Sequence, residues 1–163
     1  MTETEPAHNP LIFLDVDGMF NPIVPSENHV RHDITLPNGS SFTVFLNPKH
    51  GEEILKLALD TDAELVWGTM WQEQANEYIG PNVGLPTLPV MRVLTYKMSS
   101  TLGLDKAYSA QLYANGRKFV YLDDEVDIGL HIKDSIGKHI WVDPEYGLRP
   151  EHIVKAREFL LAA

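Results

Sequence analysis

Short apolar runs recur along the chain, and longer amphipathic stretches separate them. The runs at residues 11–16, 63–68 and 118–125 are almost continuously apolar, which is typical of strands that are buried on both faces of a parallel sheet. A further run at residues 138–143 predicts a fourth strand. Because strands that alternate with helices fold as layered sandwiches, the pattern predicts an α/β, Rossmann-like fold with a doubly wound, mainly parallel sheet.

Helical patterns occupy the stretches between these runs. Asn47 and Pro48 are residue types favoured at the N-cap and at the first position of a helix, so a helix is expected to begin there. Further helices are expected from about Trp71, over residues 97–114, and from Pro150 to the end of the chain. Apart from the helix over residues 97–114, each predicted helix follows a predicted strand or the hairpin described next.

Two segments are predicted to be connections without helix. Residues 30–46 alternate apolar and polar positions on either side of Asn38 and Gly39, and an Asn-Gly pair in this setting is a strong signal for a β-hairpin. Residues 80–90 contain three prolines and two glycines, which predicts a loop. The hairpin is thus expected to form a small flap inserted between the first strand and the first helix.

Length and composition favour one ordinary core. The chain has 163 residues, of which 44% are apolar, and no linker divides it. We therefore expect one domain over residues 1–163, with residues 1–9 as a disordered lead-in. No apolar run reaches the roughly 18 residues that a membrane span requires, and the absence of cysteine excludes disulfides and thiolate chemistry. These features favour a cytoplasmic protein without a membrane partner.

The formal net charge of −10 is the compositional feature that says most about partners. So much negative charge repels polyanions, and broad electrostatic binding of nucleic acid is not expected. A nucleic acid would enter only as a substrate whose end is bound. A cluster of acids that holds a divalent cation would account for part of the excess of negative charge. Composition gives no indication of the oligomeric state.

Polar residues follow three of the predicted strands at the points where these strands end. Asp15 and Asp17 follow the first, Thr69 follows the second, and Asp123 and Asp124 follow the third. The carboxyl ends of parallel strands meet at one edge of a sheet, so we expect these side chains to converge there. Carboxylates that lie close together repel one another, and a bound cation relieves the repulsion. Oxygen ligands without clustered His or Cys predict Mg²⁺ rather than zinc.

The first acid pair has the spacing that phosphoryl transfer requires. Asp15 and Asp17 are two residues apart and share one face of an extended strand, while Gly18 allows a sharp turn. One carboxylate can attack phosphorus while the other, partly protonated, gives a proton to the leaving oxygen and then activates water. Positive charge and a hydroxyl donor must also reach the phosphate oxygens, and we expect Lys97 and Thr69 to supply them.

The order of these residues is similar to that of the haloacid dehalogenase (HAD) superfamily. DVDGMF, which begins at Asp15, matches the first motif of the superfamily, and LVWGT, which ends at Thr69, resembles the second. YLDDE, which contains Asp123 and Asp124, resembles the fourth motif. The segment LTYKMSS places Lys97 between the second and the fourth motif, where the superfamily has a lysine. The resemblance extends over residues 11–127. It implies a magnesium-dependent phosphatase.

The resemblance also implies a role for each acid. Asp15 would be the nucleophile and a metal ligand, and Asp17 would be the general acid and base with its backbone carbonyl on the metal. Asp124 is expected as the direct carboxylate ligand of the metal, with Asp123 beside it. Asp127 would assist them.

The phosphate would be bound by residues that follow the first and second motifs. Thr69 and Lys97 are expected to hold it, together with the backbone near Gly18 and Gly68, and Trp71 is expected at the mouth of the pocket. Lys106 and Lys118 compete with Lys97 for the lysine role. Larger members of the superfamily insert a cap domain, whereas this chain has only the hairpin. A small capless member with an open site would suit large or extended phosphoesters.

Alternative interpretations remain for the residues and for the whole chain. Aspartate and threonine are also common in turns and at helix caps. The pairs Asp15 with Asp17 and Asp123 with Asp124, and Thr69, could have that structural role alone. A signalling receiver domain uses similar residues, but it would place its acid pair at the first strand and its Thr and Lys after the third. A third alternative is a HAD-like domain that binds metal or phosphate without turnover, which an activity assay would distinguish.

Overall fold

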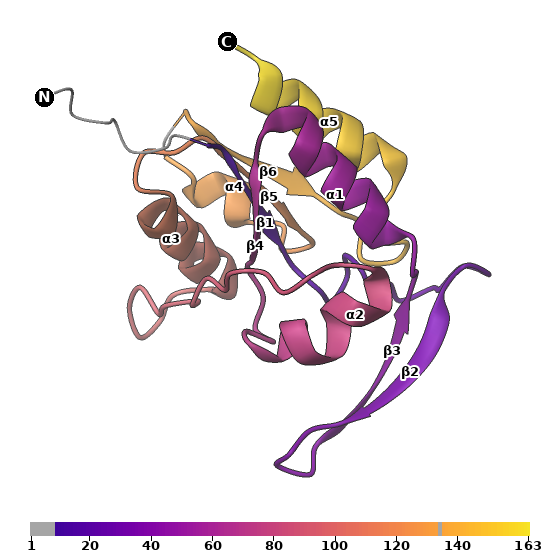
Figure 1. Ribbon diagram of the computed structural model, residues 1–163. Helices are drawn as coiled ribbons and strands as arrows, with labels where there is room; N and C mark the ends of the chain where they lie inside the picture. Colours follow the sequence, from indigo (N-terminus) through magenta and orange to yellow (C-terminus); the bar gives the residue numbers. More distant parts are fainter. Residues whose placement is uncertain (1–8, 134) are drawn as a thin grey trace, which may run out of the picture.

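The computed structural model describes residues 9–133 and 135–163, and a parallel sheet of four strands forms its centre (Figure 1). Its strands, in the spatial order β4-β1-β5-β6, are β4 (Glu64–Trp67), β1 (Leu11–Leu14), β5 (Phe119–Asp123) and β6 (Gly137–Trp141). All three pairings are parallel. The predicted α/β fold with a mainly parallel sheet is confirmed.

Alternate residues of the central strands bury opposite faces of the sheet. In β1, Ile12 and Leu14 pack into the core that contains residues of α1 and α5, whereas Leu11 and Phe13 pack into the core that contains residues of α3. Strand β1 has no exposed residue, because it is covered on both faces and flanked on both edges. This burial explains the unbroken apolar run in the sequence.

The helices lie on both sides of this sheet. Their bounds are α1 (His50–Thr61), α2 (Gly80–Val83), α3 (Leu102–Ala114), α4 (Ile128–His131) and α5 (Pro150–Leu161), with a short π-helix, η1 (Ala75–Ile79), before α2. Helices α1 and α5 pack together on one face, and α3 and α4 pack together on the other (Figure 1). The chain thus leaves β1 through α1 on one face and reaches β5 through α3 on the other.

The predicted hairpin forms a separate two-stranded sheet that projects from the body (Figure 1). Strands β2 (Val30–Thr35) and β3 (Ser41–Leu46) pair antiparallel, with Ile34 opposite Phe42. Ile34 and Val44 are buried and join the core on the α1 side. No cap domain is present among residues 9–133 and 135–163, and the hairpin is the insertion that precedes α1.

The helix boundaries differ from the sequence prediction in two places. Helix α1 begins at His50, because Asn47 accepts a hydrogen bond from the backbone N–H of Lys49 in a turn before the helix. Residues 97–100 are a turn outside α3, which begins after Thr101. The side chain of Thr101 accepts a bond from the backbone N–H of Leu104 and so caps the helix.

Two further expectations concern segments outside the sheet. The region expected to be a helix from Trp71 consists of turns, η1 and α2, so part of the predicted loop at residues 80–90 is helical. The lead-in expected at residues 1–9 lies, apart from Asn9, outside the described residues. None of the described helices is both long and apolar enough to cross a bilayer.

Candidate active site

The parallel register brings the ends of three strands to one edge of the sheet. Leu14 is paired with Trp67 of β4 on one side and with Leu122 of β5 on the other. Asp15, which follows β1, and Asp123, the last residue of β5, therefore lie at the same level. Asp15 continues the pairing, since its N–H donates to the carbonyl of Leu122 at 3.1 Å. This edge lies where the crossovers on either side of β1 run over opposite faces, which is where ligands bind in open parallel sheets.

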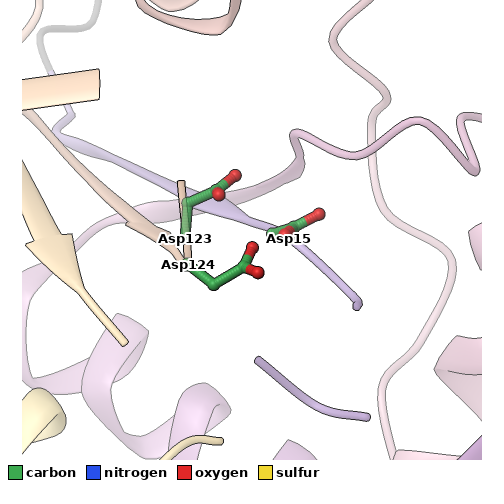
Figure 2. A group of neighbouring side chains, drawn as sticks. All are labelled: Asp15, Asp123 and Asp124. Atoms are coloured by element: carbon green, nitrogen blue, oxygen red, sulfur yellow. The ribbon is translucent and has the colours of Figure 1, made fainter. Parts of the chain in front are cut away.

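Three carboxylates meet at this edge. Asp15, Asp123 and Asp124 each offer one oxygen, and these oxygens lie within 4.8 Å of one another. Figure 2 shows the three side chains gathered around a common space, Asp15 from the end of β1 and the other two from the end of β5. Asp15 and Asp123 are buried, and Asp124 is partly exposed. The expected convergence of acids that are remote in sequence is found.

A buried lysine balances part of this negative charge. Lys106 Nζ lies 2.6 Å from Asp123 Oδ2 and 3.4 Å from Asp15 Oδ1. Its side chain is only 3% exposed. Lys106 belongs to the buried stripe of α3, which runs through Gly103, Ala107 and Ala110 toward the sheet. The lysine therefore reaches the carboxylates from the helix that covers one face of β1 and β5.

The electrostatics of this cluster are dominated by burial. Burial raises the pKa of Asp15 well above its usual value, and the nearby charge of Asp123 raises it further, although Lys106 opposes both effects. Burial likewise raises the pKa of Asp123, against the attraction of Lys106. For Lys106, burial alone would lower the pKa, but the attraction of Asp15 and Asp123 outweighs it and the pKa is raised.

Neighbouring groups fix the two acids at the end of β5. Asp123 Oδ1 accepts a hydrogen bond from the N–H of Glu125 at 2.8 Å, and its backbone carbonyl lies 2.9 Å from Nε2 of His139. The backbone carbonyl of Asp124 accepts a bond from Nε1 of Trp141 at 3.0 Å. The carboxylate of Asp123 and the backbone of Asp124 therefore have defined positions before any ligand binds.

Gly18 provides the space that Asp124 needs to approach Asp15. It has a φ of +79°, and a Cβ at this position would clash with the carboxylate of Asp124. A larger residue would therefore be strained by its backbone conformation and would also displace an acid of the cluster. Gly18 is at the site, as predicted, and it contributes a turn and free volume.

The donor set fits a hard divalent cation. Three carboxylates carry three negative charges when ionised, and Lys106 supplies a single compensating charge among the described residues. Oxygen donors without His or Cys suit Mg²⁺ or Ca²⁺. The residues that would hold such an ion are Asp15, Asp124 and Asp123, with the last engaged by Lys106. Burial, and then the charge of Asp123, raise the pKa of Asp15, and a bound cation would oppose both effects.

Asp17 lies on the exposed side of the site and does not join this cluster. Its Oδ1 accepts a hydrogen bond from Nδ2 of Asn21 at 3.0 Å, and its Oδ2 accepts one from Nε1 of Trp71 at 2.9 Å. Asn21 Oδ1 also accepts a bond from the N–H of Phe45 in the hairpin, at 2.9 Å. The carboxylate is therefore held in place while it remains open to solvent.

The residues that follow β4 have different environments. Thr69 is buried, and its Oγ1 accepts a bond from the N–H of Trp71 at 3.2 Å, as expected of a turn-forming residue next to a ligand site. Gly68, which we expected at the phosphate, has both backbone groups engaged. Its N–H donates to Leu14 and its carbonyl accepts the hydroxyl of Tyr121 at 2.5 Å. A Cβ on Gly68 would crowd Tyr121, so this glycine serves packing.

The structure does not bring Lys97, the lysine expected at the phosphate, to the carboxylate cluster. Lys97 is exposed, precedes α3, and lies over the ring of Tyr96 at 5.7 Å. Lys118 is at the opposite end of β5, where its Nζ donates to the carbonyl of Ala162. Lys106 is the lysine at the carboxylates. The signal that identifies it is the buried stripe of α3, which includes Lys106; the helix itself begins at Leu102, five residues after Lys97.

Two other residues differ from expectation. Asp127 lies beside α3, where its Oδ2 accepts a bond from the hydroxyl of Thr101 at 2.7 Å, and it is not part of the carboxylate cluster. Asn21 was not among the predicted site residues, although it joins Asp17 to the hairpin. An Asn before a Pro is so common in turns that its position gives no sequence signal for this contact.

Comparisons with known proteins found a family match and a distant structural match. Residues 11–153 match the family described as "HAD domain in Swiss Army Knife RNA repair proteins". A solved structure from Legionella pneumophila, described as a HAD superfamily (subfamily III A) hydrolase, has 14% sequence identity and a TM-score of 0.42, and the match covers 94% of this chain and 81% of that one. No curated protein matches. Because the family match spans most of the sequence, the chain belongs to the HAD-domain family of Swiss Army Knife RNA repair proteins, within the HAD superfamily.

Proposed function

We propose that this domain is a magnesium-dependent phosphomonoester hydrolase in which Asp15 is the nucleophile. The observation that carries the proposal is the cluster of Asp15, Asp123 and Asp124, the first two of them buried, with Lys106 at the switch point of the sheet. A site of this kind is costly to fold, because the buried carboxylates repel one another and lose hydration. Such a cost is typical of functional sites.

The reaction would proceed in two steps on this chain's own residues. A carboxylate oxygen of Asp15 attacks phosphorus, and the bond from phosphorus to the ester oxygen breaks to leave an aspartyl phosphate. Asp17, in its protonated form, gives its proton to the departing oxygen, which leaves as an alcohol. Asp17 then takes a proton from a water molecule as that water attacks phosphorus, which releases inorganic phosphate and restores Asp15.

Other residues would position the phosphate. Lys106 holds Asp15 at 3.4 Å and supplies positive charge beside the attacking carboxylate. Thr69 stands two residues beyond the end of β4, which pairs with β1, and its hydroxyl would donate to a phosphate oxygen. Mg²⁺ bound by Asp15 and Asp124 would neutralise the carboxylates and the phosphate oxygens. Burial of Asp15 and Lys106 strengthens each of these interactions by excluding water.

For the substrate class we propose the phosphorylated end of an RNA. The family to which the chain belongs is described by its occurrence in RNA repair proteins, which supports this choice. The small hairpin flap leaves the exposed side of the site around Asp17 accessible to an extended molecule. The net charge of −10 disfavours tight binding along a nucleic-acid backbone, so we expect recognition to be confined to the terminal nucleotide.

The proposal is tested by phosphate release from a panel of phosphomonoesters with and without Mg²⁺. We expect hydrolysis that requires the metal, and a loss on the order of 10³-fold or more in Asp15→Asn, because an amide cannot form the phosphoenzyme. Rapid acid quenching with a ³²P-labelled substrate should trap a phosphoprotein that alkali cleaves. Asp60→Asn is a matched control, since Asp60 lies on α1 and pairs with Lys56 and Arg157.

The same experiment distinguishes the alternative of a domain without turnover. If Mg²⁺ binds and no phosphomonoester is hydrolysed, the enzymatic proposal is wrong and a binding function remains. If hydrolysis persists in Asp15→Asn at the wild-type rate, the assignment of the nucleophile is wrong.

A further inference from the structure

A partly exposed aromatic pair stands beside Asp17, on the side of the site away from the buried carboxylates. Phe42 of β3 and Trp71 after β4 have ring centroids 5.4 Å apart with an angle of 56° between the rings. Phe42 is 44% exposed, and the neighbouring Met70 is 58% exposed. Large apolar side chains that are left in contact with water next to a reaction centre indicate a binding surface.

These side chains line a hollow that opens directly beside the expected acid. It has a volume of about 220 Å³, and its walls are Asp17, Leu36, Phe42, Met70, Trp71 and Gln74. This is smaller than the roughly 300–1,000 Å³ of pockets that enclose a whole small ligand, so it suits one part of a substrate. Asp17 is itself one wall, so a group in the hollow would be adjacent to the oxygen that Asp17 protonates.

The lining has the chemistry of a site for a planar, partly polar ring. Phe42 and Trp71 offer two aromatic surfaces at an angle, and Met70 offers a polarisable sulfur. Gln74 is partly buried, and its side-chain amide makes no hydrogen bond within residues 9–133 and 135–163. The amide can therefore donate a hydrogen bond to the edge of a polar ring and accept one from it. An aliphatic chain would use the apolar surface but not the amide.

The hollow is also fixed in position relative to the chemistry. Trp71 Nε1 donates to Asp17 Oδ2 at 2.9 Å, which holds the indole at the carboxylate. Phe42 is held by the hairpin register, since it stands opposite the buried Ile34. Both walls therefore keep their orientation without a ligand, which reduces the entropy lost on binding.

We propose that this hollow binds the nucleobase of the nucleotide whose phosphate is attacked by Asp15. The inference rests on the proposed hydrolase function and assigns to it a subsite for the leaving group. Stacking is the interaction available to an acidic protein, because the net charge of −10 offers little attraction for the phosphates of a nucleic-acid strand. Substrates with a base should therefore be preferred over the same phosphate ester without one.

The test compares adenosine 5′-monophosphate with ribose 5-phosphate, which share the same leaving oxygen and differ in the base. We expect kcat/KM to be about 10-fold higher for the nucleotide, with most of the difference in KM. In Phe42→Ala this preference should fall to about 2-fold or less, whereas Phe42→Tyr should keep it. Leu59→Ala, at an exposed apolar residue of α1, is the matched control and should keep the wild-type preference.

Further substrates identify the source of the base. A 5′-phosphorylated or 3′-phosphorylated oligoribonucleotide that is hydrolysed faster than the mononucleotides assigns the hollow to an RNA end, and equal rates assign it to free nucleotides. A phosphotyrosine peptide that is preferred over every nucleotide would overturn the proposal. An unchanged preference in Phe42→Ala would also overturn it.

A binding measurement keeps this inference separate from the hydrolase proposal. If no substrate is turned over, adenosine 5′-monophosphate is titrated into the Asp15→Asn protein while tryptophan fluorescence is recorded. Fluorescence quenching that is seen in the Asp15→Asn protein and is lost in the double variant Asp15→Asn, Trp71→Phe supports base binding in the hollow, even though the hydrolase proposal has failed. Quenching that is absent, or that persists without Trp71, contradicts it.

Discussion

Among the described residues, the buried acids at the strand ends and a buried histidine at the hairpin compensate for burial in different ways. At the ends of β1 and β5, Asp15 and Asp123 are buried with Lys106 between them. At the base of the hairpin, His50 is 6% exposed and packs against His29, with ring centroids 5.6 Å apart. Burial raises the pKa of the two acids, and it lowers the pKa of His50 to about 4.

The difference lies in what compensates the charge. The acids have a lysine and an arrangement of oxygens that suits a cation, so charge can be kept in the interior. His50 also loses its charge through the proximity of His29, and no carboxylate within hydrogen-bonding distance is found among the described residues. It is therefore neutral at pH 7. A perturbed pKa alone does not mark an active site, whereas one with convergent ligands and a counter-charge does.

Removal of the lysine should have the largest effect. Lys106→Met leaves Asp15 and Asp123 buried without their cation, so we expect the free energy of unfolding without metal to fall by about 3–5 kcal/mol. Phosphate release should also be lost. Chemical denaturation measures the first effect. Lys97→Met is the matched control and should be close to wild type in both respects, since Lys97 is exposed. Equal losses in both variants would restore Lys97 to the site.

The histidine should make stability depend on pH in a defined window. Because the pKa of His50 is about 4 in the folded protein and 6.5 when unperturbed, the unfolded chain binds more protons between these values. This contribution to stability is complete above pH 6.5 and is lost as pH falls to 4, by at most about 3 kcal/mol. Denaturation curves recorded from pH 7.5 to pH 4 for wild type and His50→Gln measure the difference. Parallel profiles in the two proteins would contradict the expectation.

Metal binding should stabilise the domain through the acids at the end of β5. At ten times its dissociation constant, Mg²⁺ should raise the free energy of unfolding by about 1.4 kcal/mol. Asp124→Asn should lose most of this gain, because an amide is a weaker ligand. Thermal melts with and without Mg²⁺ measure it. Asp127→Asn is the control and should keep the gain, because Asp127 bonds to Thr101 instead.

The smallest effect is expected on the exposed side of the site. Asn21→Ala removes the bond to Asp17 and leaves the N–H of Phe45 without its partner, so we expect a loss of stability of about 1 kcal/mol. The rate of hydrolysis should fall mainly through kcat, since Asp17 is held less firmly. Asn28→Ala, at an exposed position before the hairpin, provides the comparison. A rate equal to wild type in Asn21→Ala would show that Trp71 alone suffices to hold Asp17.

Much of the acidic edge of the sheet could be predicted because it depends on local patterns. An apolar run followed by acids is readable when a strand is buried on both faces, and this placed Asp15, Asp123 and Asp124 correctly at one edge. The identity of the lysine at the site could not be predicted from a local pattern of this kind. Lys97 and Lys106 are both polar residues near a helix start, and only the boundary at Leu102 decides which one points to the sheet.

The sequence by itself determined the order of the four parallel strands along the chain, the hairpin, and the acids at the strand ends, because each is encoded by hydrophobic period and turn residues within a short segment. Tertiary structure alone decided that Lys106 balances the cluster, that Asn21 and Trp71 hold Asp17, and that Phe42 meets Trp71. These contacts depend on the direction in which side chains point from packed elements, and no local pattern records that direction.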